Sequence, residues 1–399
     1  MNPADSSWPS RMNPGIHRRY GQRMRVVVAP DKFKGSATGP EVADAIAKGL
    51  RAARPDLEIA EVPVADGGDG TVAAALAAGF APVSTTAEGP TGEQVETTFG
   101  VRDGTAVIEL ADVAGLRRLP DSRPAPLRAS TYGVGQVITA ALDAAATTIV
   151  LGLGGSATTD GGAGMVQALG VRLSDESGHD LARGGAALGG AAAIDPGGLD
   201  ARIAATRLLV ASDVNNPLLG PSGAAAVFGP QKGASQDDVA VLDRALARWA
   251  ALTRSVTGLD VANTPGAGAA GGTGFAALAY LGAQLVPGAE LMLDLIGFDA
   301  ALAEAGLVIT GEGRLDRQSL GGKAPVGVAR AAGQRGVPVV VVAGQVELSP
   351  AELTSAGFAA AYSLADFEPD PAASMARTAE LLEALGGRIA ADLVGNAAT

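Results

Sequence analysis

Residues 147–165 read TTIVLGLGGSATTDGGAGM, an apolar run followed by a segment with six glycines and one carboxylate. The run TTIVL predicts a buried strand, and GAGMVQAL, which starts at Gly162, predicts a helix. A glycine cluster directly behind a strand is typical of places where the backbone turns sharply or lies against a ligand. The stretch therefore predicts a strand, a phosphate-binding loop and a helix.

The same order recurs in RVVVA with EVADAIAKGLRAA, in EIAEVPV with TVAAALAAG, and in LVIT with the loop GEGRLDRQSLGG and KAPVGVARAAG. Repetition of strand and helix predicts parallel sheets with helices on both faces, and ligands that bind beyond the carboxyl ends of the strands. Thr38 and Glu41 have the spacing of a capping box, which starts the first helix near Gly39. Between Val83 and Glu109 the apolar runs shorten and alternate, which predicts hairpins of a second, mixed domain.

Length and charge narrow the class of protein. A chain of 399 residues is long enough for two domains. Its formal net charge of −12 argues against a nucleic-acid partner, and no apolar run reaches the roughly 20 residues of a membrane helix. The start of the chain lacks the apolar region of a secretory signal, so the expected location is the cytoplasm. A homo-oligomer is compatible with the sequence, which leaves the oligomeric state open.

The small number of Cys and His residues limits the kinds of catalytic and metal site that the chain can form. The chain has no Cys and two His, His17 and His179, and His179 lies in the polar stretch SDESGHDL. This composition excludes disulfides and a thiolate zinc site, and it argues against a His-rich metal site and a Ser-His-Asp triad. Carboxylates, Lys, Arg and backbone amides remain to carry a reaction.

Four loops that follow predicted strands carry the candidate groups. They are Lys32 and Lys34 in APDKFKGS, Asp66 and Asp69 in VADGGDGT, Asp213, Asn215, Asn216 and Lys232 in residues 211–233, and Glu312, Arg314, Asp316 and Lys323 in VITGEGRLDRQSLGGK. Basic groups at such an edge can bind an anion, and carboxylates on short turns suit Mg²⁺. Solvated lysines, Asx turns and a surface salt-bridge loop are the structural alternatives.

Two glycine patterns favour a dinucleotide-dependent oxidoreductase instead. The spacing GxGxxA occurs at residues 152–157, with Asp175 or Glu176 about 20 residues further on, as in a Rossmann fingerprint. A literal GxGxxG at residues 266–271 follows VANTP rather than a strand. Against this alternative, Asp160 interrupts the place where a pyrophosphate would bind, and DESGHD reads as a turn. The P-loop pattern GxxxxGK[ST] is absent from the sequence.

Taken in order, the loops resemble the signature blocks of the bacterial glycerate kinase family. The blocks are APDKFKGS, ADGGDGT, GLGGSATTDGGAGMVQALG, SDVNNPLLGPSGAAAVFGPQKGA, GAGAAGGTGFAALAYLGAQLVPG and TGEGRLDRQSLGGKAPVGVA, and they cover nearly the whole chain from Met24. Lys32 departs from the family's usual small polar residue, and Thr159 from its usual Asn. The second departure bears on substrate affinity rather than on reaction type.

The resemblance implies ATP-dependent phosphorylation of D-glycerate with Mg²⁺, most simply to 2-phosphoglycerate. It also implies two α/β domains with an active-site cleft between them. We expect a disordered leader over residues 1–23, a parallel flavodoxin- or Rossmann-like domain of residues 24–82 plus 290–399, and an inserted mixed α/β domain of residues 83–289. The alternatives are a kinase that forms 3-phosphoglycerate or acts on another short hydroxy acid, the oxidoreductase, and a non-catalytic ligand sensor.

The family's reaction gives the candidate residues hypothetical roles. The amides of Gly154, Gly155 and Ser156, placed at a helix N-terminus, would hold ATP phosphates together with Lys232 and Lys323. The catalytic candidates are Asp160, Asp213, Glu312, Lys34 and Arg314. Of these, the three carboxylates would hold Mg²⁺ or accept the substrate proton, while the two cations would bind the glycerate carboxylate or the γ-phosphate. The substrate-binding candidates are Asp66, Asp69 and Asn215.

Overall fold

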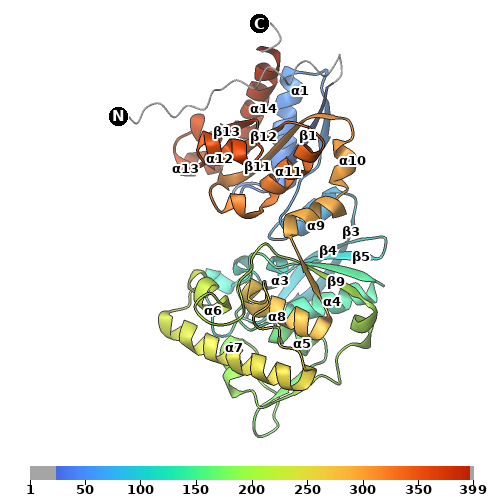
Figure 1. The fold of residues 1–399 in the computed structure, drawn as a ribbon, viewed down its shortest axis with the longest axis vertical. Helices are drawn as coiled ribbons and strands as arrows, with labels where there is room; N and C mark the ends of the chain where they lie inside the picture. Colours follow the sequence, from blue (N-terminus) through green and yellow to red (C-terminus); the bar gives the residue numbers. More distant parts are fainter. Residues whose placement is uncertain (1–23, 396–399) are drawn as a thin grey trace. The chain divides into compact units, whose positions relative to one another are not determined.

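The computed structural model describes residues 24–395, which form two compact units (Figure 1). The first unit comprises the described residues up to Asp66, the segment Ala73–Ala78 and the residues from Ala289 onward. The second comprises Gly67–Val72 and Gly79–Gly288. The leader expected over residues 1–23 lies outside the described residues.

The first unit is built on a five-stranded sheet in the order β13-β12-β11-β1-β2, with every neighbouring pair parallel. The strands are β1 (Arg25–Pro30), β2 (Glu58–Glu61), β11 (Ala305–Leu315), β12 (Val339–Val346) and β13 (Ala360–Ser363). Its helices are α1 (Gly39–Ala53), α10 (Phe298–Leu302), α11 (Ala324–Gln334), α12 (Pro350–Ser355), α13 (Pro371–Ala376) and α14 (Thr378–Gly395), together with α2 (Thr71–Ala77) and α9 (Gly288–Leu295), whose first residues belong to the second unit. The parallel sheet predicted from the repeated strand-helix order is confirmed.

Both faces of this sheet are covered by helices, as its near-continuous apolar strands require. Val26 and Val28 of β1 pack with α1 and α14, whereas Val27 and Ala29 pack on the opposite face with α11. The capping box is present, because Thr38 Oγ1 accepts from Glu41 N and the Glu41 carboxylate accepts from Thr38 N at 2.8 Å. The predicted start of α1 is therefore confirmed.

One loop prediction was wrong. The sequence predicted a loop from Gly311, yet β11 continues to Leu315 and pairs with β12 as far as Val346. The glycines allow two backbones to approach rather than to turn, since a Cβ at Gly311 would lie 2.4 Å from Val342 O. A Cβ at Gly344 would similarly lie 2.4 Å from Gly313 O.

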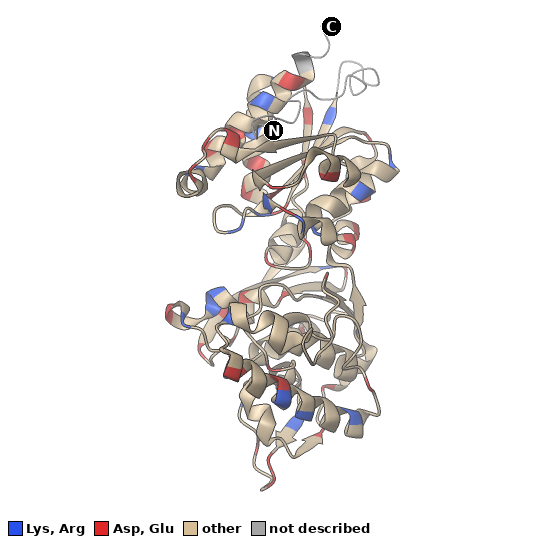
Figure 2. Ribbon diagram, turned by 60° about the vertical axis from the view of Figure 1, so that its left-hand side comes forward, with Lys and Arg blue, Asp and Glu red and all other residues tan. Residues whose placement is uncertain are grey.

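This sheet has a switch point, which is the place where the connections from two adjacent strands lead to opposite sides of the sheet. From β1 the chain passes through α1 to β2 on one side, and from β11 it passes through α11 to β12 on the other. The carboxyl ends of the adjacent strands β1 and β11 are therefore where crossovers diverge, and open α/β sheets bind ligands at such places. Figure 2 shows acidic and basic residues intermixed on the ribbon of this unit.

The second unit contains a six-stranded mixed sheet in the order β10-β9-β6-β5-β4-β3. Its strands are β3 (Ala81–Glu88), β4 (Gln94–Arg102), β5 (Thr105–Glu109), β6 (Thr148–Gly152), β9 (Arg207–Ala211) and β10 (Gln284–Val286), with β7 (Arg172–Ser174) and β8 (Ala193–Asp195) in a separate hairpin. In the six-stranded sheet the pairs β3–β4 and β4–β5 are antiparallel and the pairs β5–β6, β6–β9 and β9–β10 are parallel, which confirms the predicted hairpins and mixed sheet.

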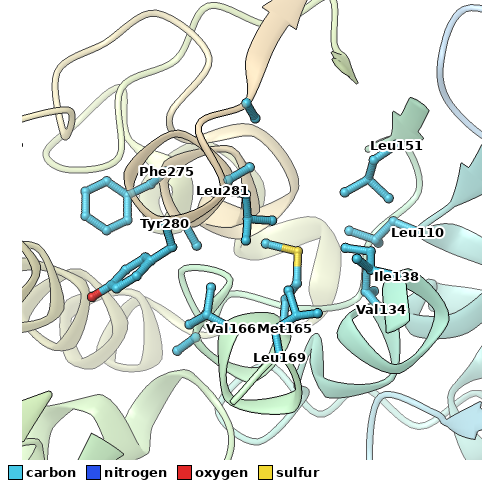
Figure 3. Packing of buried hydrophobic residues seen from close by; sticks show 14 of the residues in the cluster. Leu110, Val134, Ile138, Leu151, Met165, Val166, Leu169, Phe275, Tyr280 and Leu281 are labelled. Atoms are coloured by element: carbon cyan, nitrogen blue, oxygen red, sulfur yellow. The ribbon is translucent and has the colours of Figure 1, made fainter. Parts of the chain in front are cut away.

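The helices of the second unit hold the glycine-rich segment behind β6 in place. They are α3 (Ala111–Ala114), α4 (Tyr132–Asp143), α5 (Ala163–Ala168), α6 (Ala224–Phe228), α7 (Gln236–Thr257) and α8 (Ala269–Leu281). Figure 3 shows Met165 and Val166 of α5 packed between α8 and α4. Trp249 of α7 is fully buried, stacks on Tyr280 with ring centroids 5.5 Å apart, and donates to Gly161 O.

Candidate active site

The glycines behind β6 are required first by the packing of two loops. A Cβ at Gly152 would lie 2.5 Å from Gly67 O, and a Cβ at Gly154 would lie 2.4 Å from Gly68 Cα. Gly155 has a φ of +75°, which an L side chain rarely adopts. The turn that begins at Gly67 and the loop that begins at Leu153 therefore lie directly against each other at the carboxyl edge of the second sheet.

The helix predicted from Gly162 is present, but the three amides proposed to bind phosphate lie well before its first turn. Helix α5 begins at Ala163 with Gly162 as its N-cap, so the amides of Gly154, Gly155 and Ser156 do not belong to a helix N-terminus. Positive φ angles at Gly161 and Gly162 precede the helix, so residues 154–156 are not at its N-terminus as the sequence predicted. This part of the sequence prediction was wrong, although the loop remains a candidate anion site for a different reason.

The loop remains a candidate anion site because its tip is exposed and two of its amides make no backbone hydrogen bond. Gly155 is exposed, and its carbonyl accepts from Leu116 N at 3.1 Å, while Ala157 N donates to Ala114 O at 2.9 Å. Within residues 24–395, neither Gly155 N nor Ser156 N donates to a backbone carbonyl. The two amides are therefore available to an anion without loss of a backbone hydrogen bond.

Asp160 is fully buried beneath this loop. Its Oδ2 accepts from Thr131 N at 2.8 Å, from Thr131 Oγ1 at 2.9 Å, and from Ser130 Oγ and Gly164 N at longer range. Gly162 N donates to its Oδ1 at 3.2 Å. Burial raises the pKa of Asp160, and these donors oppose the rise. The geometry favours Asp160 as an organiser of the loop rather than as a group that touches substrate.

Lys232 also lies beneath the loop, in the turn after α6. Its Nζ donates to Ser156 Oγ at 2.8 Å and to Thr158 O at 2.6 Å, and the residue is 3% exposed. Burial lowers the pKa of Lys232 to about 7, while the Asp160 charge acts in the opposite direction. A neutral amine has two N–H donors, which matches these two hydrogen bonds.

Two further hydroxyls of the loop are buried without a partner. Thr158 Oγ1 and Thr159 Oγ1 take part in no hydrogen bond within the described chain, and both residues are 0% exposed. Buried polar groups are normally paired, so each hydroxyl has capacity for a water or a ligand. The loop thus combines free amides, spare hydroxyls and an amine close to its titration point.

A second group of charges lies beside the loop, and the sequence analysis identified only part of it. Glu109 ends β5, is buried, and accepts from Gly70 N at 3.0 Å and Val72 N at 3.3 Å. Asp69, a predicted substrate-binding residue, is paired with Arg117. Burial raises the pKa of Glu109 to about 8, and the negative charge of Asp69 adds to the rise. A carboxylate that ends a buried strand was the signal that could have identified Glu109.

We expect Glu109→Gln to increase stability at alkaline pH. Because the folded pKa of Glu109 lies above the unfolded value of 4.5, the contribution of Glu109 to stability is fully present below pH 4.5 and is lost as the pH rises toward 8. Gln keeps the acceptor for Gly70 N and Val72 N and never ionises. The melting temperature of the variant minus that of wild type should therefore grow between pH 5 and pH 8.5. A constant difference over this range would contradict the assignment.

The remaining candidates of the second unit lie at the end of β9. Asp213 is half-buried and its Oδ1 accepts from Gly288 N at 2.8 Å, whereas Asn215 is exposed. Asn216 Nδ2 donates to Ser222 O at 2.8 Å, so this amide has a partner within the loop. Asp213 follows the carboxyl end of a parallel strand, where an anionic ligand or a metal can reach it.

In the first unit, the carboxyl ends of β11 and β1 gather acidic and basic groups. Glu312 is 6% exposed, and its Oε2 lies 3.4 Å from Lys323 Nζ. Burial raises the pKa of Glu312, and the Ser319 hydroxyl and Lys323 oppose the rise. Asp66, which lies beyond β2, is near enough for its charge to raise the pKa values of Asp31 and Glu312. Asp31 was not identified by the sequence analysis, which considered only the lysines of its loop.

The basic candidates of this unit differ in their surroundings. Lys34 is exposed, and it forms no ion pair within residues 24–395. Arg314 is bound to Glu347, with a shortest distance of 2.6 Å, and its side chain is 62% exposed. Asp316 accepts from Gln318 N at 2.8 Å and so forms an Asx turn. Lys34 is thus the group better placed to take a new anionic partner.

Comparison with known proteins identifies the family. The family model described as "Glycerate kinase family" matches residues 26–394. The chain belongs to the glycerate kinase family. Glycerate kinase from Bacillus subtilis (strain 168) is 43% identical over 93% of this chain and 98% of that protein, and glycerate 2-kinase from Escherichia coli (strain K12) is 46% identical over 81% of this chain and 86% of that protein.

A solved structure agrees with the family assignment. The crystal structure of a protein assigned as glycerate kinase 2 from Salmonella typhimurium LT2 matches with a TM-score of 0.82 and 42% identity, covering 94% of this chain and all of that one. Glycerate kinases are ATP-dependent phosphotransferases with an alcohol acceptor, so the expected enzyme class is confirmed.

The glycine fingerprint of an oxidoreductase does not match this member of the glycerate kinase family. Asp175 follows β7, which belongs to the separate hairpin, and its carboxylate accepts from Ser177 N and His179 N in a tight turn. A Rossmann site needs that carboxylate at the end of a neighbouring parallel strand. Within the described chain, no helix is long and apolar enough to cross a membrane.

Proposed function

We propose that this protein transfers the γ-phosphoryl group of ATP to a hydroxyl of D-glycerate and forms 2-phosphoglycerate. The observation that carries the proposal is the family match over residues 26–394, and the name glycerate 2-kinase of the E. coli relative supports the position of transfer. The glycine loop with two available amides suits a polyphosphate ligand. Because the reaction uses ATP, we infer a cytoplasmic location.

We propose that the loop from Gly154 to Ser156 binds ATP phosphates. Amides that donate to no backbone carbonyl can satisfy phosphate oxygens at no cost in protein hydrogen bonds. Lys232 supports this role from beneath, because it fixes Ser156 Oγ and Thr158 O. An anion at the loop would also favour the protonated form of the Lys232 amine.

Among the three carboxylates expected to bind Mg²⁺, Asp213 fits best. Asp160 is enclosed by five donors, and Glu312 already lies next to the cation of Lys323. Within residues 24–395 no group of three or more His, Asp or Glu side chains is arranged around a metal position. Mg²⁺ commonly uses one or two carboxylates together with substrate phosphates and water, which Asp213 can satisfy. The metal would neutralise charge on the transferred phosphoryl group.

Lys34 and Arg314 are the proposed partners of the glycerate carboxylate or the γ-phosphate. Lys34 extends from the loop behind β1 and Arg314 from the end of β11, on either side of the switch point. Lys323 Nζ lies 3.4 Å from Glu312 Oε2 on the same strand as Arg314. The half-buried Asp66 is a proposed acceptor for a substrate hydroxyl. We retain Asp69 and Asn215 as proposed substrate contacts of the second unit.

A ³¹P NMR time course tests the function. Purified protein is incubated with ATP, Mg²⁺ and D-glycerate, with L-glycerate, other short hydroxy acids and no acceptor as separate controls. We expect a new phosphate monoester resonance with D-glycerate, and its coupling to one methine proton identifies the 2-phosphate. Coupling to two methylene protons would indicate 3-phosphoglycerate. Intact ATP with every acceptor would overturn the kinase and favour a ligand sensor.

A further inference from the structure

Asp31 lies at the switch point of the first unit's sheet. It follows β1 directly, and its backbone N donates to Gly311 O of β11 at 2.8 Å. Glu312 directly follows Gly311, the last residue of β11 that pairs with β1. Two carboxylates thus extend from neighbouring strands at the place where open α/β sheets bind ligands.

Both carboxylates are buried to an unusual degree for a folded sheet. Asp31 is 5% exposed and Glu312 is 6% exposed. Buried carboxylates cost stability unless they are fully paired, and these two also repel each other and Asp66. Packing alone does not require acidic side chains here, because apolar residues would fill the same positions at lower cost.

The hydrogen bonds of the pair are incomplete. Glu312 Oε1 is buried and accepts no hydrogen bond within the described chain, while its Oε2 lies 3.4 Å from Lys323 Nζ. Asp31 Oδ1 accepts from Lys32 N at 2.7 Å and from Lys32 Nζ at 3.4 Å. A buried acceptor without a donor indicates that a ligand with a hydroxyl or amine supplies one.

We propose that Asp31 accepts the proton of the glycerate hydroxyl that is phosphorylated, and that Glu312 Oε1 accepts a hydrogen bond from the other hydroxyl. This inference rests on the proposed function. Glycerate carries two neighbouring hydroxyl groups, and one of them can supply the donor that Glu312 Oε1 lacks. Each carboxylate lies 3.4 Å from a lysine Nζ, and we assign the proton to Asp31 because it directly follows the carboxyl end of β1 at the switch point, while Glu312 Oε1 is left to accept a hydrogen bond.

The step balances without a further reactant. The hydroxyl oxygen forms a bond to the γ-phosphorus of ATP, and the bond from that phosphorus to the β,γ-bridging oxygen breaks. The electron pair of the broken bond leaves on ADP, and the hydroxyl proton moves to Asp31 Oδ2. Proton acceptance by a positioned carboxylate is the usual contribution of a kinase aspartate to a reaction that otherwise depends on alignment.

The surroundings of Asp31 suit a proton acceptor near neutral pH. Burial raises the pKa of Asp31 to about 7, Lys32 lowers it, and Asp66 and Glu312 raise it. Lys32 lies on its own loop, Asp66 beyond β2 and Glu312 on β11, with Lys323 behind Glu312. A base must be ionised to act, so kcat/KM for glycerate should rise as the pH increases through about 7.

The test is Asp31→Asn in the full chain, with the initial rate of ADP formation measured over glycerate concentration and pH. Asn keeps the shape and the acceptor for Lys32 N but takes up no proton. We expect kcat to fall by about 10²- to 10⁴-fold. KM for glycerate should change by less than about threefold, and the limb of the pH profile near 7 should vanish. Asp44→Asn, on α1 with Lys48 as its partner, is the matched control that keeps wild-type rates.

The melting temperature of Asp31→Asn distinguishes a catalytic role of Asp31 from a structural one. We expect the melting temperature of Asp31→Asn to equal or exceed that of wild type, because a buried ionisable group is removed. A large fall in melting temperature together with lost ATP binding would show a structural role and overturn the inference. Wild-type kcat with an unchanged pH profile in the variant would overturn it as well. Wild-type protein that phosphorylates no hydroxy acid would instead overturn the proposed function, and this inference with it.

Discussion

Replacing Asp160 with Ala should destabilise the second unit by about 3–5 kcal/mol, because several buried donors lose their acceptor at about 1–3 kcal/mol each. The substitution leaves the amides of Thr131, Gly162 and Gly164 buried without the carboxylate they now bond. Trp249 is a local probe of the loss, because its Nε1 donates to Gly161 O. In a Trp8→Phe background it is the chain's single tryptophan, so its fluorescence during urea unfolding reports on this unit.

Asp160→Asn separates the structural role from the catalytic role predicted by the sequence. Asn keeps one acceptor oxygen but directs an NH₂ group at donors, so we expect an intermediate loss of stability and a rate that falls in parallel. A variant with wild-type stability and turnover lowered by orders of magnitude would support direct catalysis by Asp160. Wild-type stability in both Asp160→Ala and Asp160→Asn would show that the five hydrogen bonds do not hold the loop.

The sequence predicted secondary structure well where burial follows a local pattern. The run RVVVA became β1 because both faces of its sheet are covered, and Thr38 with Glu41 began α1 as the capping box indicated. The prediction failed where glycine served packing rather than turning. Gly311 lies within a strand because only a residue without Cβ fits against Val342 O, a contact between segments that periodicity does not describe.

The candidate site was predicted less completely, because its residues meet through non-local pairing. Asp31 and Glu312 are neighbours only because β1 pairs with β11 in one register. Glu109 contacts the turn at Gly70 only through the fold of the second unit. The sequence indicated which loops follow strands, and thus which residues could lie near a ligand. It did not indicate how far each carboxylate would be buried, which decides whether it organises a loop or accepts a proton.

Replacing Lys232 with Met should raise KM for ATP by about ten- to a hundredfold while the protein stays folded. Hydrogen bonds that involve a charged group contribute about 1.5–3 kcal/mol, and each 1.4 kcal/mol is a factor of ten in affinity. Met has a similar length and fills the buried space, but it releases Ser156 Oγ and Thr158 O, which then no longer fix the loop. Initial rates over ATP concentration measure the effect, with Arg244→Met on the exposed side of α7 as the control.

Proton uptake provides a second readout that a purely structural lysine would not give. The pKa of Lys232 lies near 7, below its ordinary value of 10.5, so the amine is largely neutral at pH 8 in the free protein. A phosphate bound at the loop favours the charged form, and ATP binding at pH 8 should therefore take up a proton. Calorimetric titration in buffers of different ionisation enthalpy measures this uptake, which should disappear in Lys232→Met. An unchanged KM for ATP together with unchanged proton uptake would show that Lys232 does not support the phosphate site.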